Sequence, residues 1–211
     1  HYRKKQGLDI SRDDLYDLIF YLILGVVLGA RLWVVLISEP SYYLSNPSEI
    51  IALWHGGMSF FGGFIGVIIA GIIFCKKKRI NFLKLADYIA IPAALFLAIG
   101  RVANFINGEL VGVITDPSGV PWCVVFRGYE GCRHPSQLYG FFARLVAFFI
   151  LLFISRKNTK QGTLFWSFIL LMGISRFIVD FFRDDPRILG MTVAQYLSLI
   201  MFFVGAGMLL F

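Results

Sequence analysis

Six long apolar runs constrain the fold of this chain more than any other feature of its sequence. Each run approaches the roughly 20 residues that a helix needs to cross the hydrocarbon core of a bilayer. The runs are continuously apolar rather than alternating, which favours helices over the strands of a membrane barrel. We therefore predict six spans, near residues 18–37, 50–75, 83–99 (continuing towards 106), 138–154, 163–182 and 189–211.

The composition indicates the same fold class. Of the 211 residues, 58% are hydrophobic and 16% are charged, and the mean hydropathy is +0.74. A soluble domain has about 45–50% apolar and about 25% charged residues. These values exclude a soluble enzyme. They predict an all-α, polytopic transmembrane helical bundle, with residues 1–211 forming one integral membrane domain and residues 107–137 its only long loop.

The positive charge is arranged in alternate loops. The net charge is +7, and all eight lysines lie at the start of the chain or in the loops at 76–84 and 156–160. The loops at 38–49, 107–137 and 183–188 contain no lysine. Lysine-rich loops stay in the cytoplasm, so we expect both termini there and residues 107–137 to form a small exported arm. Because the charge follows the topology, no nucleic-acid partner is expected.

Residues 100–110, GRVANFINGEL, place polar groups at the end of the third apolar run. An arginine at the centre of a membrane helix costs roughly 2.5–3.5 kcal/mol on insertion scales, so Arg101 is expected to have a specific role. At helical spacing Arg101, Asn104 and Gly108 (i, i+3, i+7) share one face. The absent side chain at Gly108 predicts a gap that admits a ligand.

The fifth run ends in SRFIVDFFRDD, a charged stripe on one helix face. Arg176, Asp180 and Arg183 stand at i, i+4 and i+7, and Asp180 can pair with either arginine. The stripe is either a self-neutralising network that joins helices or an anion site, since a guanidinium binds phosphate through a planar fork of donors. Burying both Arg101 and Arg176 costs roughly 5–7 kcal/mol, which favours an anionic ligand, in a membrane a phospholipid head group.

Two further arginines and two cysteines are secondary candidates. Arg31 and Arg144 also lie in the spans, but each stands near a helix end from which its guanidinium can reach the interface. Cys123 and Cys132 share the exported loop, where an oxidising compartment allows them to pair; the alternative is two free thiols. The sequence shows no metal-ligand spacing, so neither a metal nor another cofactor is expected.

The second run is rich in glycine. The pairs Gly56–Gly57 and Gly62–Gly63 serve either close helix packing or a backbone opened so that its N–H groups meet a phosphate or a carbonyl. His55, at the outer edge of this run, is either a hydrogen-bonded interfacial residue or a base.

The exported loop offers one further acid. Glu109 is a candidate acid or base near the outer membrane face, or else it forms a salt bridge with an arginine. At the other end of the loop His134 precedes Pro135, which predicts an extended backbone, and Ser136 is expected to cap the helix that follows.

Four motifs in order, GGMSFFGG, GRVANFINGELVG, HPSQLYG and SRFIVDFFR, resemble those of prolipoprotein diacylglyceryl transferases. The resemblance runs from about residue 14 to residue 195. It implies a multi-pass enzyme of the bacterial plasma (inner) membrane with seven spans, of which the first would be missing here. It also implies transfer of the diacylglyceryl group of phosphatidylglycerol to the lipobox cysteine thiol of a prolipoprotein, with release of glycerol phosphate and no cofactor. The partners would be phosphatidylglycerol, the prolipoprotein signal peptide and membrane lipids, and we expect a monomer.

The resemblance also assigns roles to residues of this chain. The expected catalytic residues are Arg101, Asn104, Glu109, Arg176 and Asp180. Arg101 would also bind the lipid phosphate, and the other expected substrate-binding residues are Gly62, Gly63, Asn107, Gly112, His134, Gln137 and Arg183.

Three positions depart from the pattern of the family. Phe61 stands where the family has the histidine proposed as the base for the thiol, Gly140 stands where it usually has glutamate, and Asp180 is shorter than the usual glutamate. The alternative reading is therefore a degenerate, non-catalytic lipid-binding relative. A small-solute transporter would show paired repeats in its hydropathy, and none is evident.

Overall fold

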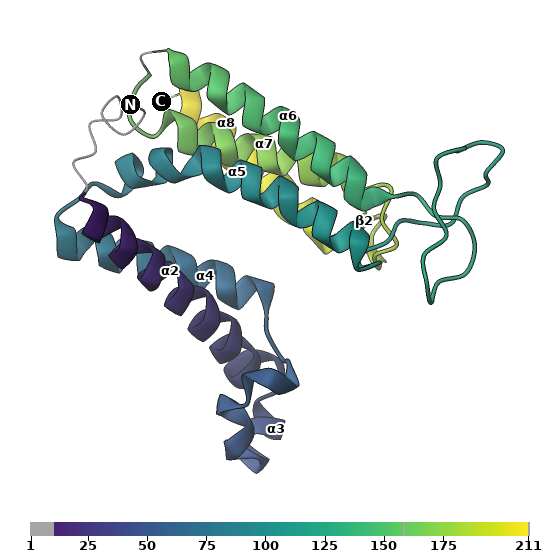
Figure 1. Ribbon diagram of the computed structural model, residues 1–211, viewed down its shortest axis with the longest axis horizontal. Coiled ribbons are helices and arrows are strands. Elements are labelled where there is room, and N and C mark those ends of the chain that lie inside the picture. The colour runs from purple at the N-terminus through teal and green to yellow at the C-terminus, as the bar shows by residue number, and fades with distance from the viewer. Residues whose placement is uncertain (1–10, 158, 211) are drawn as a thin grey trace. The chain divides into compact units, whose positions relative to one another are not determined.

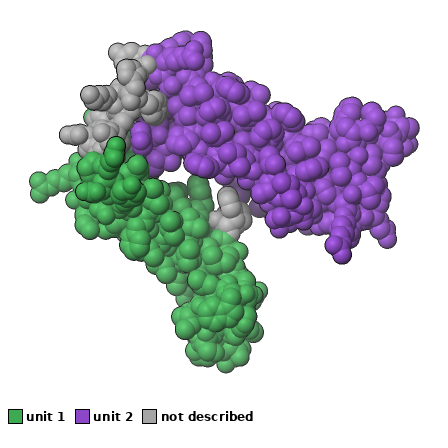
Figure 2. All heavy atoms as spheres, in the orientation of Figure 1, with its two compact units in different colours: residues 1–85 green, residues 86–211 purple. Residues whose placement is uncertain are grey.

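The computed structural model describes residues 11–157 and 159–210, apart from the side chains of Phe60 and Phe61 (Figure 1). The chain divides into two compact units, His1–Leu85 and Ala86–Phe211 (Figure 2). The described elements are helical except for one two-stranded hairpin formed by β1 (Arg187–Ile188) and β2 (Met191–Thr192). The predicted single membrane domain stays a prediction.

Five helices of the described chain are long and apolar enough to cross a membrane, which confirms an all-α, polytopic membrane protein. The first is α2 (Arg12–Trp33) continued by a π-helical turn, η1 (Val34–Ser38). The others are α5 (Phe82–Ile106), α6 (Ser136–Arg156), α7 (Thr163–Asp180) and α8 (Val193–Leu210). The second predicted run, 50–75, is occupied by α4 (Phe60–Lys78), which ends in three lysines.

The predicted start of the second run, residue 50, is wrong. A short helix, α3 (Pro40–Ser45), and two 3₁₀ turns, η2 (Pro47–Ile51) and η3 (Leu53–His55), precede α4. Gly56 and Gly57 have φ of 86° and 72°, which a right-handed helix cannot continue. Ser59 then caps α4 by accepting a hydrogen bond from the Gly62 N–H at 3.4 Å.

Within the first unit, α2 packs against α4 through small residues. A Cβ added at Gly25 would lie 2.6 Å from the Gly66 carbonyl oxygen and 2.7 Å from the Cβ of Ala70. A Cβ at Gly62 would overlap the carbonyl oxygen of Gly29. The two backbones therefore approach as closely as the small-residue interfaces of membrane helices allow.

A buried guanidinium fixes the segment between α2 and α4. Arg31 is 5% exposed, and its donors bind backbone carbonyls from the 3₁₀ turns and from the glycine pair at 56–57; its acceptors are Glu49, Ile50, Ala52, Gly56 and Gly57. The guanidinium also lies 5.0 Å from the centroid of the Tyr43 ring. The helix-end position from which Arg31 could extend is used instead to place its charge among carbonyls of its own chain.

Within the second unit, α6 and α8 both pack on α7, and Figure 1 shows the three helices running alongside one another. A Cβ added at Gly173 of α7 would lie 2.8 Å from the Ser198 carbonyl oxygen of α8. The buried Asp87 of α5 accepts hydrogen bonds from the N–H groups of Gly162 at 2.6 Å and Phe165 at 2.8 Å. This carboxylate satisfies the N-terminal donors of α7 and joins that helix to α5.

The loop between α5 and α6 is tied at its base and clamped near its tip. The Gly112 N–H donates to the His134 carbonyl at 3.1 Å, and the Val113 N–H donates to the Phe182 carbonyl at 3.0 Å. A disulfide joins Cys123 to Cys132, whose Cα atoms lie 5.5 Å apart. Of the two alternatives left open by the sequence, the structure has the paired form. The ends of α5, α6 and α7 are thus brought together on one side of the second unit.

Candidate functional site

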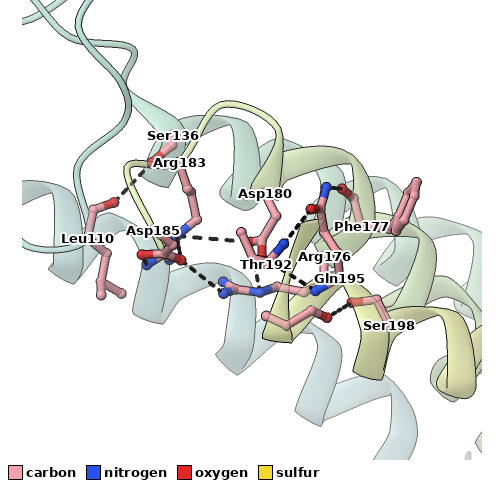
Figure 3. Close-up of polar contacts among 12 residues, drawn as sticks. Leu110, Ser136, Arg176, Phe177, Asp180, Arg183, Asp185, Thr192, Gln195 and Ser198 are labelled. Atoms are coloured by element: carbon pink, nitrogen blue, oxygen red, sulfur yellow. Dashed lines mark hydrogen bonds and ion pairs between the residues drawn. The ribbon is translucent and has the colours of Figure 1, made fainter. Parts of the chain in front are cut away.

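A cluster of six charged residues, called here the arginine cluster, lies inside the second unit. Its members come from α5, α6, α7 and the segment that follows α7. They are Arg101, Arg144, Arg176, Asp180, Arg183 and Asp185, and Figure 3 shows the four that belong to α7 and its extension.

Asp180 is the buried centre of the α7 side of the cluster. Its side chain is 0% exposed. Its Oδ2 accepts a hydrogen bond from the Thr192 hydroxyl at 2.6 Å, and its Oδ1 lies 3.0 Å from the Nε of Arg176 and 3.9 Å from the Nε of Arg183. The prediction that Asp180 can pair with either arginine is confirmed, because positions three and four residues apart face one another at the end of a helix.

A second carboxylate completes the network (Figure 3). Arg183 grips Asp185 with two parallel hydrogen bonds, of 2.8 Å from Nε and 3.0 Å from Nη2. Asp185 Oδ2 also lies 3.7 Å from Nη2 of Arg176. Arg176 and Arg183 therefore share two carboxylates between them; Arg183 is oriented by charge-assisted hydrogen bonds and Arg176 by ion pairs.

The α5 and α6 side of the cluster is different, because no described carboxylate forms a hydrogen bond or a close ion pair with either of its two arginines. The guanidinium of Arg101, in the last turns of α5, makes no hydrogen bond or ion pair with any other residue that the structure describes. The Arg144 side chain of α6 donates from Nη1 to the carbonyl of Gly140 at 2.8 Å, is repelled by the charges of Arg101, Arg176 and Arg183, and is attracted by that of Asp180. Four arginines thus face two aspartates, which leaves two positive charges in excess.

The end of the GRVANFINGEL motif forms a hydrogen-bonded turn rather than a further stretch of helix. The Asn104 amide donates to Oε2 of Glu109 at 3.1 Å, and the Glu109 N–H donates to the Asn104 carbonyl at 2.9 Å. Gly108, with φ of 67°, lies beyond the end of α5 at Ile106. The prediction that Gly108 shares a helix face with Arg101 is therefore wrong, since a left-handed residue ends the helix. Glu109 has no ion pair with an arginine in the described chain.

The HPSQLYG motif holds that turn in place from the start of α6. Gln137, 1% exposed, donates from Nε2 to the Glu109 carbonyl at 2.7 Å. Ser136 donates its hydroxyl to the Leu110 carbonyl at 3.0 Å (Figure 3). The prediction that Ser136 caps α6 is wrong: it is the first residue of the helix, Pro135 precedes it, and no side chain caps that end.

The loop base contributes backbone and ring contacts. A Cβ added at Gly112 would lie 2.6 Å from the Phe182 carbonyl oxygen, so only glycine fits there. His134 Nδ1 lies 3.0 Å from the Tyr139 hydroxyl, and its ring lies 5.3 Å from that of Phe182. Arg133 binds Asp184 at 2.7 Å, which ties the loop to the segment after α7.

The remaining predicted residues have contacts within their own segments. Asn107 is exposed, and its N–H donates to the Ala103 carbonyl at 2.9 Å. Gly62 and Gly63 belong to the first unit, where the Gly63 N–H keeps its helical bond to the Ser59 carbonyl at 3.0 Å, so α4 is not opened at this pair. His55 bonds to Glu49 at 2.8 Å. This pair agrees with the hydrogen-bonded alternative for His55.

The sequence did not identify Asp185 and Arg144 as members of the cluster, nor Thr192 and Gln195 as the residues that support Asp180. Asp185 stands two residues beyond Arg183, and its acidity in FFRDD was the available signal. Thr192 reaches Asp180 because the β1–β2 hairpin turns the chain back, and Gln195 supports Thr192 by accepting its N–H at Oε1, at 2.9 Å. Arg144 was ranked too low, since it is buried rather than extended to an interface.

Comparison with known proteins places these motifs in one family. A family model described as prolipoprotein diacylglyceryl transferase matches residues 1–211. The chain belongs to the prolipoprotein diacylglyceryl transferase family. A phosphatidylglycerol–prolipoprotein diacylglyceryl transferase of Geobacter sulfurreducens is 45% identical over 211 residues, which cover 97% of this chain and 80% of the relative. Relatives of the same name in Bordetella parapertussis and Cupriavidus metallidurans are 48% and 44% identical, covering 94% and 92% of this chain and 78% and 74% of the relatives.

Two departures from the usual pattern of prolipoprotein diacylglyceryl transferases lie inside the arginine cluster. At Asp180 the shorter carboxylate still reaches Arg176 and Thr192. At Gly140 a Cβ would lie 3.4 Å from Cδ of Arg101 and 2.8 Å from Nη1 of Arg144, so the two arginines occupy the space beside the glycine. The third departure, Phe61, has its side chain outside the described residues.

Proposed function

We propose that this chain transfers the diacylglyceryl group of phosphatidylglycerol to the cysteine thiol of a prolipoprotein lipobox and releases glycerol phosphate. Family membership supports the reaction. The observation that supports the site is Arg101, a half-buried guanidinium that no described carboxylate neutralises. A buried cation without a partner is costly in a bilayer, and a lipid phosphate brought by the substrate removes that cost.

The phosphate binds between Arg101 and Arg176 in this proposal. Arg176 keeps its Nε on Asp180 at 3.0 Å and has only a longer contact, 3.7 Å, from Nη2 to Asp185. Its outer nitrogens can therefore turn to a phosphate without loss of a short ion pair. Arg183, held on Asp185 by two bonds, adds positive potential.

The reaction is a displacement at carbon. The thiol releases its proton to solvent, and a neighbouring guanidinium favours the resulting thiolate. The sulfur attacks the terminal glyceryl carbon of the diacylglyceryl group, a C–S bond forms, and the C–O bond to the phosphate breaks. The electron pair of that bond stays on the phosphate oxygen. Arginines that stabilise this developing charge lower the barrier.

The two motifs around the cluster position the reacting groups. Asn104 and Glu109 hold each other through side-chain and backbone bonds, and Gln137 fixes Glu109 through its carbonyl. We propose that Glu109 and Asn104 orient the head-group hydroxyls or the incoming thiol. His134 and Gly112 build the wall at the loop base, and Asn107, Gly62 and Gly63 are proposed to bind lipid.

The topology and assembly belong to the same proposal. Lysine-rich loops point to a chain in the bacterial inner membrane with both described ends cytoplasmic and the α5–α6 loop outside. The Cys123–Cys132 disulfide fits an oxidising exterior. We propose that the protein acts as a monomer.

The test is glycerol phosphate release in liposomes that contain phosphatidylglycerol and a lipobox peptide. Turnover by the wild-type protein and a loss of about 100-fold or more for Arg101→Lys are expected, since a point charge replaces a two-pronged donor. Binding of the lipid without any release would instead establish the lipid-binding alternative. Full activity of Arg101→Lys would contradict the proposed site.

A further inference from the structure

Arg144 is a buried, positively charged residue that has no role in the proposed reaction mechanism. It is 7% exposed, and the one hydrogen bond of its side chain to a described residue is the contact from Nη1 to the Gly140 carbonyl. A guanidinium has five donors, so most of the hydrogen-bonding capacity of Arg144 is unused. An unpartnered buried cation is expensive enough to require a compensating anion.

The position of Arg144 points its charge towards the proposed phosphate site. Gly140 lies one helical turn before it on α6, and a Cβ there would contact Arg101 at 3.4 Å and Arg144 at 2.8 Å. The two side chains thus flank one glycine, and Arg144 is repelled by the charges of Arg176 and Arg183 and attracted by that of Asp180. The absence of a side chain at Gly140 is what allows Arg101 and Arg144 to come together.

The excess charge of the cluster matches the product better than the substrate. A phosphodiester such as phosphatidylglycerol carries one negative charge. When the C–O bond breaks, the released glycerol phosphate is a monoester with a charge close to −2 at neutral pH. Four arginines against two aspartates leave an excess of two positive charges. Interactions that strengthen as charge develops raise the rate rather than the affinity for substrate.

We propose that Arg144 is a third guanidinium ligand of the phosphate, which takes up the second negative charge as glycerol phosphate leaves. This inference rests on the proposed function. It assigns Arg101 and Arg176 to the charge present from the start and Arg144 to the charge that forms during the reaction.

The experiment measures kcat and KM for glycerol phosphate release by wild-type protein, Arg144→Gln and Arg144→Lys. Arg144→Gln is expected to lower kcat by about 100-fold, the size typical of one lost donor to a developing oxyanion, with KM for phosphatidylglycerol changed less than about threefold. Arg144→Lys keeps the charge, so its kcat is expected to lie between those of the wild-type protein and Arg144→Gln. Inhibition by added glycerol phosphate is expected to weaken about tenfold in Arg144→Gln.

The matched control is Arg127→Gln, which removes one exposed positive charge from the α5–α6 loop and is expected to behave as wild type. If Arg144→Gln does not fold, Arg144→Lys carries the comparison. An Arg144→Gln protein with wild-type kcat and product inhibition overturns the inference while leaving the proposed function intact. A wild-type protein that releases no glycerol phosphate refutes the proposed function instead, and direct titration of glycerol phosphate into wild type and Arg144→Gln then decides the role of Arg144.

Discussion

Replacement of Asp180 by asparagine tests whether the arginine cluster is held together by charge. Asparagine has nearly the same shape, so the substitution removes the charge from a fully buried group and leaves its volume unchanged. The Thr192 hydroxyl, at 2.6 Å, can still donate to an amide oxygen, but Arg176 loses its partner at 3.0 Å. Breaking one partner of a buried ion pair costs about 3–5 kcal/mol.

The magnitude follows from what Arg176 keeps. In the variant Arg176 retains its contact with Asp185 at 3.7 Å, and the Arg176 side chain is 23% exposed. We therefore expect a loss of stability at the lower end of that range, about 3 kcal/mol. For a chain of this size 1 kcal/mol shifts Tm by roughly 2–4 °C, so Asp180→Asn is expected to lower Tm by roughly 6–12 °C. Thermal unfolding in detergent micelles, followed by near-UV circular dichroism, measures the shift.

Two control variants separate charge from hydrogen bonding. Thr192→Val removes the donor to Oδ2 of Asp180 and leaves both ion pairs, so its effect is expected to be about 1.5 kcal/mol, half that of Asp180→Asn. Asp116→Asn neutralises an exposed loop aspartate and is expected to leave Tm unchanged. A wild-type or higher Tm for Asp180→Asn would refute the reasoning, since it would mean that the arginines do not need the carboxylate.

Three further outcomes follow from local geometry. Gly66→Ala is expected to separate α2 from α4 and to cost more than 2 °C in Tm, while Gly71→Ala, whose Cβ would meet an aromatic carbon at 3.6 Å, is tolerated in the same thermal scan. Arg31→Lys replaces a fork that binds five carbonyls, so limited proteolysis between residues 39 and 59 is expected to be faster, and an unchanged digestion pattern would contradict this. Mass spectrometry after alkylation is expected to find Cys123 and Cys132 protected until a reductant is added, and labelling of both without reductant would contradict the disulfide.

The fold was largely predictable because each span carries its own signal. A run of about 20 apolar residues forces its backbone to bond internally whatever its neighbours are. The errors fall where backbone conformation is set by single residues. Gly56 and Gly57 delay α4 to Phe60, and Gly108 ends the motif helix at Ile106. Glycine is compatible with helix and turn alike, so a pattern of apolar residues does not distinguish the two.

The two sides of the arginine cluster were not equally predictable. Arg176, Asp180 and Arg183 share one helix end, so their spacing alone predicted their contacts, and the structure confirms them. Arg144, by contrast, lies against Gly140, a residue without a side chain. Whether its guanidinium extends to an interface or turns inward depends on a glycine one turn away and on the side chain of α5 that fills the space.

The net charge of the arginine cluster therefore depends on how the helices pack against one another, and not on the sequence of any single helix. Asp180 and Asp185 neutralise two guanidinium groups of the cluster from within α7 and its extension. Arg101 and Arg144 come from two other helices, neither of which adds a described carboxylate to the arginine cluster. The surplus of two charges therefore exists only once the three helices have assembled. An anion that carries a complementary charge binds the folded bundle alone and stabilises it by mass action. Glycerol phosphate is accordingly expected to raise the Tm of the wild-type protein and to raise that of Arg144→Gln less, and equal shifts in the two proteins would argue against a role for Arg144 in the charge balance.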